Sequence, residues 1–105
     1  MDMNAIMEQA KQFQHKMTEM QEQLADKTVT ASVGGGMVTA VVNGRHEVVS
    51  IVIDKEVINP EDPGMLQDLV VAAINEAMKQ AKEMIQAEMS KLTGGLGLDI
   101  PNMFG

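Results

Sequence analysis

The sequence predicts an α+β fold in which two long helices flank a three-stranded antiparallel meander, in the order α-β-β-β-α. Apolar residues recur at helical spacing over residues 2–26 and 62–92, whereas residues 27–54 alternate with the period of a strand. Glycine-rich turns divide this middle segment. The 105 residues are expected to form one domain over residues 1–92, followed by a flexible glycine-rich tail at 93–105.

The composition indicates an aliphatic, methionine-rich core. The chain has 11 Met, two Phe, and neither Trp nor Tyr, and methionine packs adaptably where aromatic side chains are few. The absence of Cys excludes disulfides, thiolate nucleophiles and cysteine-based metal sites. The start of the sequence lacks the apolar run of a secretory signal, and no segment approaches the roughly 20 apolar residues of a membrane helix. We therefore expect a cytoplasmic protein without membrane association.

Residues 2–26 predict a helix with a narrow apolar seam. Its members follow one another at alternating spacings of three and four: Met3, Ile6, Ala10, Phe13, Met17, Met20 and Leu24. This a/d pattern is typical of a coiled coil and is narrower than the stripe that a globular core usually takes from a helix. The seam predicts packing against another long helix, with self-association as the main interpretation. Packing against the sheet of the same domain is the alternative.

Residues 27–54 predict three strands joined by two tight turns. Two-residue turns at Gly34-Gly35 and Asn43-Gly44 would place Val38 opposite both Ala31 and Val49. One face is then apolar and is expected to form the core: Val29, Ala31, Val33, Val38, Ala40, Val42, Val49, Ile51 and Ile53. The other face is rich in Thr and Ser, and we expect it to be hydrated or covered by a partner: Thr28, Thr30, Ser32, Met37, Thr39, Val41, His46, Val48, Ser50 and Val52.

The second turn carries the single arginine of the chain and one of its two histidines, in the stretch VVNGRHEV. In the predicted register Arg45 and Glu47 lie on the core face, where burial of two charges under a helix is costly. The tip is therefore expected to protrude beyond the helical cover. Two interpretations stay open: a polar hairpin end with a weak Arg45–Glu47 ion pair, or a small basic point, Arg45 and His46, that contacts a polyanion.

Residues 62–92 predict a second, longer helix. Asp62 before Pro63 suits an N-cap followed by proline at the first helical position. The helix would be roughly 45 Å long, whereas a compact chain of this length has a radius of gyration of about 13 Å. Its distal half must project beyond the domain. Met84, Ile85 and Met89 on that half require a partner surface, which is a second indication of a homodimer.

Neither a catalytic nor a metal-binding constellation is recognisable in the sequence. The glycines Gly34, Gly35 and Gly36 precede a strand and match no phosphate-binding fingerprint. His15 occupies a solvent-facing heptad position, and neither histidine has metal-ligand spacing. No nucleophile–base pair can be named. The sequence therefore predicts a protein that is not an enzyme and that uses no metal, cofactor or small-molecule substrate.

The net charge of −7 opposes bulk attraction to nucleic acid. If the protein binds DNA, its few cations predict few phosphate contacts, modest affinity and a steep loss of affinity with salt. An aromatic platform for single-stranded bases is also missing. The alternative is an acidic, methionine-rich protein–protein interaction module without direct DNA binding, because adaptable apolar surface and negative charge would suit a basic protein partner.

Four stretches occur in a specific order: MEQAKQFQHKM in the first helix, GGGMVTAVVNGRHEVVSIVID across the strands, MLQDLVVAAINEAMKQAKE in the second helix, and LTGGLGL after it. Together they cover nearly the full chain and resemble the YbaB/EbfC family of small bacterial nucleoid-associated proteins. The resemblance implies an α-β-β-β-α homodimer whose paired helices project like tweezers. It also implies a cytoplasmic location at the nucleoid, binding of double-stranded DNA with low or variable sequence specificity, and a role in chromosome organisation and gene expression.

In this family, DNA contact is generally attributed to the projecting helices. The matching positions here are the cations of the two predicted helices: Lys11, Lys16, Lys79, Lys82 and Lys91. Arg45 and His46 at the hairpin tip are further candidates for phosphate contact.

Overall fold

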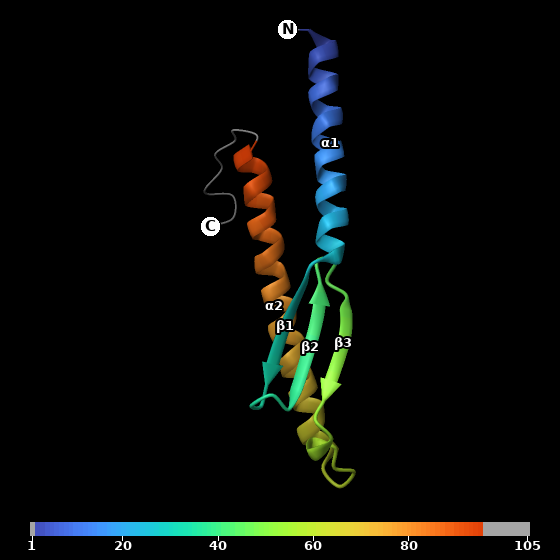
Figure 1. The fold of residues 1–105 in the computed structure, drawn as a ribbon, viewed down its shortest axis with the longest axis vertical. Coiled ribbons are helices and arrows are strands. Elements are labelled where there is room, and N and C mark those ends of the chain that lie inside the picture. Colours follow the sequence, from blue (N-terminus) through green and yellow to red (C-terminus); the bar gives the residue numbers. More distant parts are fainter. Residues whose placement is uncertain (1, 96–105) are drawn as a thin grey trace.

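The computed structural model describes residues 2–95 and has the predicted order of elements (Figure 1). These are α1 (Met3–Asp26), β1 (Thr28–Val33), β2 (Val38–Asn43), β3 (Val48–Ile53), a short 3-10 helix η1 (Lys55–Val57) and α2 (Pro63–Gly95). The predicted α+β class with its α-β-β-β-α order is confirmed, and η1 is an addition to it. Helix α2 ends at Gly95, three residues later than predicted, and the rest of the expected flexible tail lies outside the described residues.

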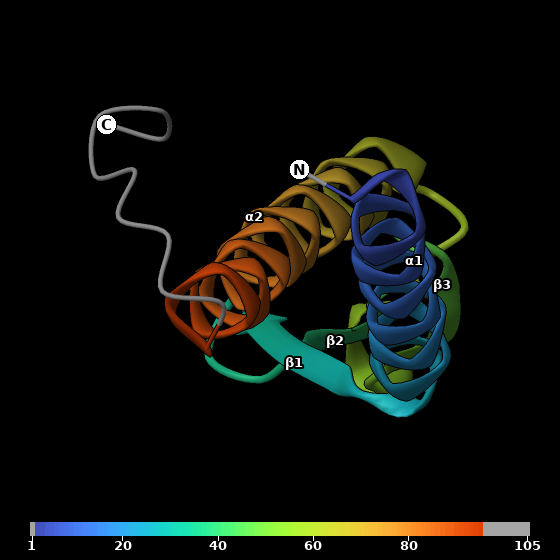
Figure 2. The same ribbon diagram turned by 90° about the horizontal axis from the view of Figure 1, so that it is seen from above.

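The molecule is elongated. It measures 70 × 25 × 16 Å, with a radius of gyration of 19.4 Å, compared with about 13 Å for a compact chain of this length. Figure 1 shows both helices extending beyond the same end of the sheet, α1 farther than α2, and Figure 2 shows that the projecting end of α2 lies to one side of α1. One chain therefore presents two projecting helical arms, which are the N-terminal part of α1 and the C-terminal part of α2.

Local capping explains where the helices begin. Asp2 precedes α1, and its side chain accepts a hydrogen bond from the backbone N–H of Asn4 at 3.0 Å. Before α2, Oδ1 of Asp62 accepts one from the N–H of Met65 at 3.4 Å, with Pro63 as the first helical residue. Each cap satisfies a donor that the helix itself leaves unpaired. The predicted capping of α2 is confirmed.

The sheet has the order β1-β2-β3 with both pairs antiparallel, but both predicted registers are wrong. Ala31 pairs with Ala40 rather than Val38, a shift of two residues, and Val38 pairs with Ile53 rather than Val49, a shift of four. Side chains alternate between faces with period two, so an even shift leaves each residue on its predicted face. Most residues of the strands therefore lie on the predicted face of the sheet, although the predicted pairing is wrong.

Longer loops cause the register shifts. The β1–β2 connection takes four residues, Gly34 to Met37, with the N–H of Met37 donating to the carbonyl of Val33 at 3.1 Å. The three glycines have φ values of 64°, 68° and 93°, which L side chains rarely adopt. Met37, predicted on the polar face of the sheet, lies in this loop instead.

The second hairpin has a loop organised by Asn43. The N–H of Asn43 donates to the carbonyl of Glu47 at 3.0 Å, and its Oδ1 accepts from the N–H groups of Arg45 and Glu47 at 2.9 and 3.1 Å. His46 has a φ of 60°, the left-handed conformation that ends such loops. The predicted Arg45–Glu47 ion pair does not occur in the described chain, because the Glu47 carboxylate accepts from Nδ2 of Asn43 at 3.0 Å.

The core lies between α2 and the first two strands. Ala73, Ala77 and Ala81 recur every four residues along α2 and are fully buried against this part of the sheet. Their small side chains let the helix approach the strands closely. The strand side of this core consists of Ala31, Val38, Ala40 and Val42, with Val29, Val33, Ile51 and Ile53 partly buried around them.

The third strand is the part of the sheet that α2 covers least. Val48, Val49 and Val52 are 42%, 55% and 62% exposed. Val49 was predicted in the core; it lies instead beside a register irregularity, since Val41 pairs with Ser50 but Val42 pairs with Val48. Helix α2 crosses β1 and β2 and leaves this apolar strand at the open edge of the sheet.

Candidate nucleic-acid interface

The apolar seam of α1 is buried only near the sheet. Leu24 is 3% exposed and Met17 and Met20 are half-buried, but Phe13, Ile6 and Met3 are 40%, 45% and 75% exposed. Ala10, between them, is also exposed. The projecting half of α1 therefore carries an apolar stripe that its own chain leaves uncovered.

The base of this seam opens into a cavity of about 560 Å³ between the two helices and the second hairpin. Met17, Met20 and Leu24 of α1 face Ile85 and Met89 of α2 across it. Half of the residues predicted for a dimer interface thus gather around one space, and Met84 is half-buried on the same part of α2. Among the described residues, neither Asp nor Glu lines this cavity, so its walls are uncharged except at the hairpin.

The tip of the second hairpin docks against the end of α1, so the prediction that it protrudes beyond the helical cover is wrong. The N–H of Gly44 donates to the carbonyls of Leu24 at 3.0 Å and Lys27 at 3.1 Å. The last carbonyls of a helix lack partners within the helix, and Gly44 approaches closely enough to supply one. A Cβ at this position would lie 2.2 Å from the Leu24 oxygen. Arg45 lies beside this contact, at the edge of the apolar cavity, rather than on the core face of the sheet.

The candidate DNA-binding cations do not form one patch. Lys16 and Lys91 line a common cavity of about 330 Å³ between the helices, whereas Lys11 is exposed farther along α1. Lys79 and Lys82 lie about 200° and 140° around α2 from the buried Ala77, at 100° per residue, and are therefore on its outer face. Arg45 and His46 line the apolar cavity at the hairpin. The structure brings together Lys16 with Lys91, and Arg45 with His46.

An ion pair links the end of α1 to α2 at the base of the two arms. Nζ of Lys27, directly after α1, donates to Oε1 of Glu88 on α2 at 2.7 Å, and Nζ of Lys91 lies 3.3 Å from the same oxygen. The hydrogen bonds from Lys27 and Lys91 lower the pKa of Glu88 from its usual value of 4.5. Lys27 and Glu88 are 61 residues apart, so no local sequence pattern indicated this pair.

Replacement of Glu88 by glutamine is expected to lower the melting temperature at pH 7, because the two lysines lose their anionic partner. Since the pKa of Glu88 is lower in the folded than in the unfolded chain, its stabilising effect is present above pH 4.5. The effect disappears as the pH falls through the lowered folded-state pKa. Thermal melts followed by circular dichroism from pH 7 to about pH 3 should therefore converge for the two proteins. Glu22→Gln, on the exposed surface of α1, is the control, and an equal loss in that variant would contradict a specific role.

Other kinds of site find no support in the described part of the chain. Within residues 2–95, no group of three or more His, Asp or Glu side chains is placed to hold a metal ion. In the same range, neither helix contains a stretch apolar enough to cross a membrane.

Comparison with known proteins points to one family. Residues 1–96 match the model of the YbaB/EbfC DNA-binding family. A nucleoid-associated protein of Syntrophobacter fumaroxidans is 55% identical over 101 residues, with 93% of this chain and 92% of the relative covered. A nucleoid-associated protein of Acetivibrio thermocellus is 50% identical over 103 residues, with 98% and 90% covered. The crystal structure of an uncharacterized protein from Helicobacter pylori superposes with a TM-score of 0.77 at 25% identity, covering 88% of this chain and 97% of the other.

Proposed function

This chain belongs to the YbaB/EbfC DNA-binding family, which is not an enzyme family, and on that premise we propose that it is a homodimeric nucleoid-associated protein of the bacterial cytoplasm. It binds duplex DNA through its helical arms with low sequence specificity, and contributes in this way to chromosome organisation and gene expression. The observation that carries the proposal is the family match from residue 1 to residue 96, which includes both arms.

The exposed seam of α1 supports the homodimer. Met3, Ile6 and Phe13 are 75%, 45% and 40% exposed in one chain. Contact of such an apolar stripe with water is unfavourable in free energy, and burial against a partner removes this contact. The interface that we propose consists of the seam and the distal half of α2: Met3, Ile6, Ala10, Phe13, Met17, Met20, Leu24, Met84, Ile85 and Met89. A second copy, also at −7, meets least repulsion at this uncharged stripe.

The charge distribution supports DNA contact at the distal half of α2. Residues 77–95 of α2 carry three lysines against two acids, whereas residues 54–68, at the opposite end of the molecule, carry five acids and one lysine. DNA phosphates are therefore attracted to the distal half of α2 and repelled from the far end. Residues 2–26 carry five acids and two lysines, so α1 offers the individual cations Lys11 and Lys16 rather than a positive surface. The proposed contacts are Lys11, Lys16, Lys79, Lys82 and Lys91, with Arg45 and His46 at the base of the arms.

The residue types also bear on specificity. Lysine presents a compact point charge that suits a phosphate, whereas recognition of guanine edges typically uses the planar fork of arginine. Six of the seven proposed contacts are lysine or histidine, and the chain has a single arginine. Phosphate contacts position a protein on the duplex without reading its sequence, so low sequence specificity is the expected behaviour.

A salt-titrated gel shift on duplex DNA tests this function. At low salt and micromolar dimer the protein is expected to retard the duplex, and the affinity should fall steeply as salt rises. In the variant Lys16→Gln with Lys91→Gln, the slope of log K against log salt should become shallower by about 1 for each phosphate that the protein no longer neutralises. Lys55→Gln, in η1 at the far end, is the control and should leave the slope unchanged. Absence of retardation at low salt would refute the proposed function.

A further inference from the structure

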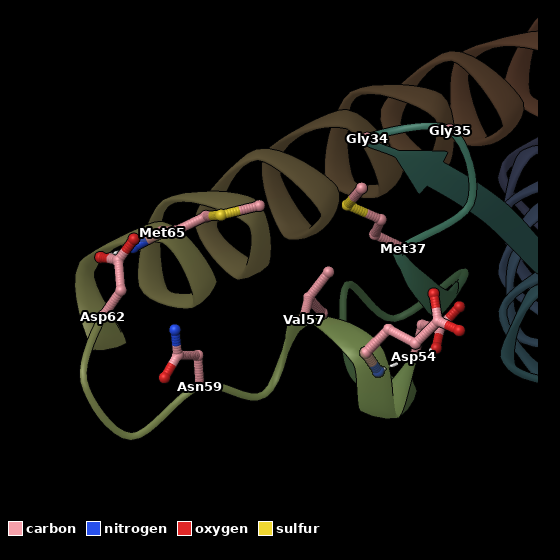
Figure 3. A pocket seen from close by; sticks show the side chains of 9 residues that line it. Gly34, Gly35, Met37, Asp54, Val57, Asn59, Asp62 and Met65 are labelled. Atoms are coloured by element: carbon pink, nitrogen blue, oxygen red, sulfur yellow. Dashed lines mark hydrogen bonds between the residues drawn. The ribbon is translucent and has the colours of Figure 1, made fainter.

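A second surface lies at the end of the molecule opposite the arms, between the β1–β2 loop, η1 and the start of α2 (Figure 3). It encloses a cavity of about 420 Å³. Its walls combine three apolar side chains, Met37, Val57 and Met65, with three carboxylates, Asp54, Glu56 and Asp62. We refer to these six residues as the acidic groove.

The apolar part of the acidic groove is adaptable. Figure 3 shows Met37 and Met65 pointing toward each other from the loop and from α2, with Val57 directed at the space between them. Met65 is 45% exposed, and the neighbouring Ile58 is 54% exposed. Unbranched thioether side chains adjust to irregular partners at low cost, so these walls suit an inserted aliphatic chain.

Hydrogen bonds hold two of the three carboxylates in place, but none of the three is neutralised. Asp54 and Asp62 lie at the two ends of the groove in Figure 3, and each uses an oxygen to cap backbone, at 3.0 Å to the N–H of Glu56 and 3.4 Å to the N–H of Met65. Within residues 2–95 none of the three carboxylates of the groove forms an ion pair with Lys, Arg or His. The groove is therefore an apolar slot with uncompensated negative charge around it.

We propose that the acidic groove docks an arginine side chain presented by a basic segment of a protein partner. An arginine carries an aliphatic stem below a planar cation. The stem packs between Met37, Val57 and Met65, and the guanidinium reaches the carboxylates at the rim. The same negative charge repels DNA phosphates, so a partner held here does not compete with DNA for the arms.

Fluorescence anisotropy with a defined probe tests this site. The probe is a fluorescein-labelled peptide with two arginines between two leucines, flanked by glycines, and the control peptide has glutamates in place of the arginines. At low salt the full-length protein should bind the arginine peptide and not the glutamate peptide. Glu56→Lys should weaken binding about tenfold, since it reverses a rim charge, whereas Glu22→Lys, the same change on α1, should alter it by less than about twofold.

The proposal would be overturned if the arginine peptide did not bind at a protein concentration of about 0.1 mM, where even weak sites are occupied. Equal binding of the glutamate peptide, or equal weakening by Glu22→Lys, would also overturn it. Met65→Ser provides a second variant that keeps the rim charges and removes one apolar wall. It should also weaken binding, and unchanged affinity in both groove variants would exclude this cavity as the site. Gel shifts of the same variants should retain DNA retardation.

Discussion

Replacement of Gly44 by alanine is expected to destabilise the fold by about 3 kcal/mol or more, at or above the upper end of the usual range for a single substitution. The added Cβ would lie 2.2 Å from the carbonyl oxygen and 2.7 Å from the carbonyl carbon of Leu24. Both are backbone atoms, so no side-chain rotation relieves the contact. The hairpin must then move away from α1, which also breaks the hydrogen bonds from Gly44 to Leu24 and Lys27. Urea denaturation followed by circular dichroism measures the loss of stability.

Two other glycines provide matched controls for this substitution. Gly35 has a φ of 68° but no atom within 4 Å of an added Cβ, so Gly35→Ala should cost only the left-handed strain, about 1–2 kcal/mol. Gly64 lies in the first turn of α2, and an added Cβ meets nothing closer than Oδ1 of Asp62, at 3.8 Å. Gly64→Ala should be neutral or stabilising by about 0.4–1 kcal/mol. A destabilisation at Gly44 no larger than that at Gly35 would show that the hairpin docks elsewhere.

Introduction of two glutamates into the seam, Phe13→Glu with Met17→Glu, is expected to convert the dimer to a monomer. Phe13 lies at the inner end of the exposed stripe and Met17 borders the cavity between the arms. Burial of an unpaired carboxylate in an apolar contact costs several kcal/mol, and the two chains would bring four together. Light scattering at tens of micromolar should give the 11.4 kDa mass of one chain, against twice that mass for the unaltered protein.

The control for the seam variant carries the same change in charge on the same helix. Gln12→Glu with Thr18→Glu alters exposed positions outside the a/d seam and should leave the mass unchanged. DNA affinity should fall at least about tenfold in the seam variant, because a monomer offers half as many phosphate contacts. A dimeric mass for the seam variant would place the interface elsewhere, with the exposed Val48, Val49 and Val52 of β3 as the next surface to alter. A monomeric mass for the unaltered protein would refute the homodimer itself.

The strands illustrate how a prediction can be right about faces and wrong about partners. Alternation places Val38, Ala40 and Val42 on one side of β2 whichever residues they pair with, and all three are fully buried. Pairing depends on loop length, and both loops are longer than the two residues that were predicted. The left-handed conformations of three consecutive glycines and the side-chain hydrogen bonds of Asn43 favour these longer loops.

Some features of the candidate site were likewise predictable from the sequence, and others were not. The seam of α1 was predicted from apolar residues that recur at alternating spacings of three and four. In the structure the outer half of this seam is exposed, on the part of α1 that projects beyond the sheet. The ion pair between Lys27 and Glu88 was not predictable, and neither was the grouping of Lys16 with Lys91. Each of these arrangements depends on where α2 lies relative to α1, and no local repeat encodes that distance.

The sequence by itself determined the types and order of the elements, their apolar faces, the start of α2 and the family. These properties follow from periodicity and capping, which act over a few residues, and from the order of the motifs along the chain. Only the tertiary structure decided the strand registers, the weaker coverage of β3 than of β1 and β2 by α2, and the docking of Gly44 beneath α1. The physical reason is that backbone carbonyls and charged side chains take partners by proximity in space. For Gly44 and Leu24, that proximity arises only once the helix end and the hairpin are both formed.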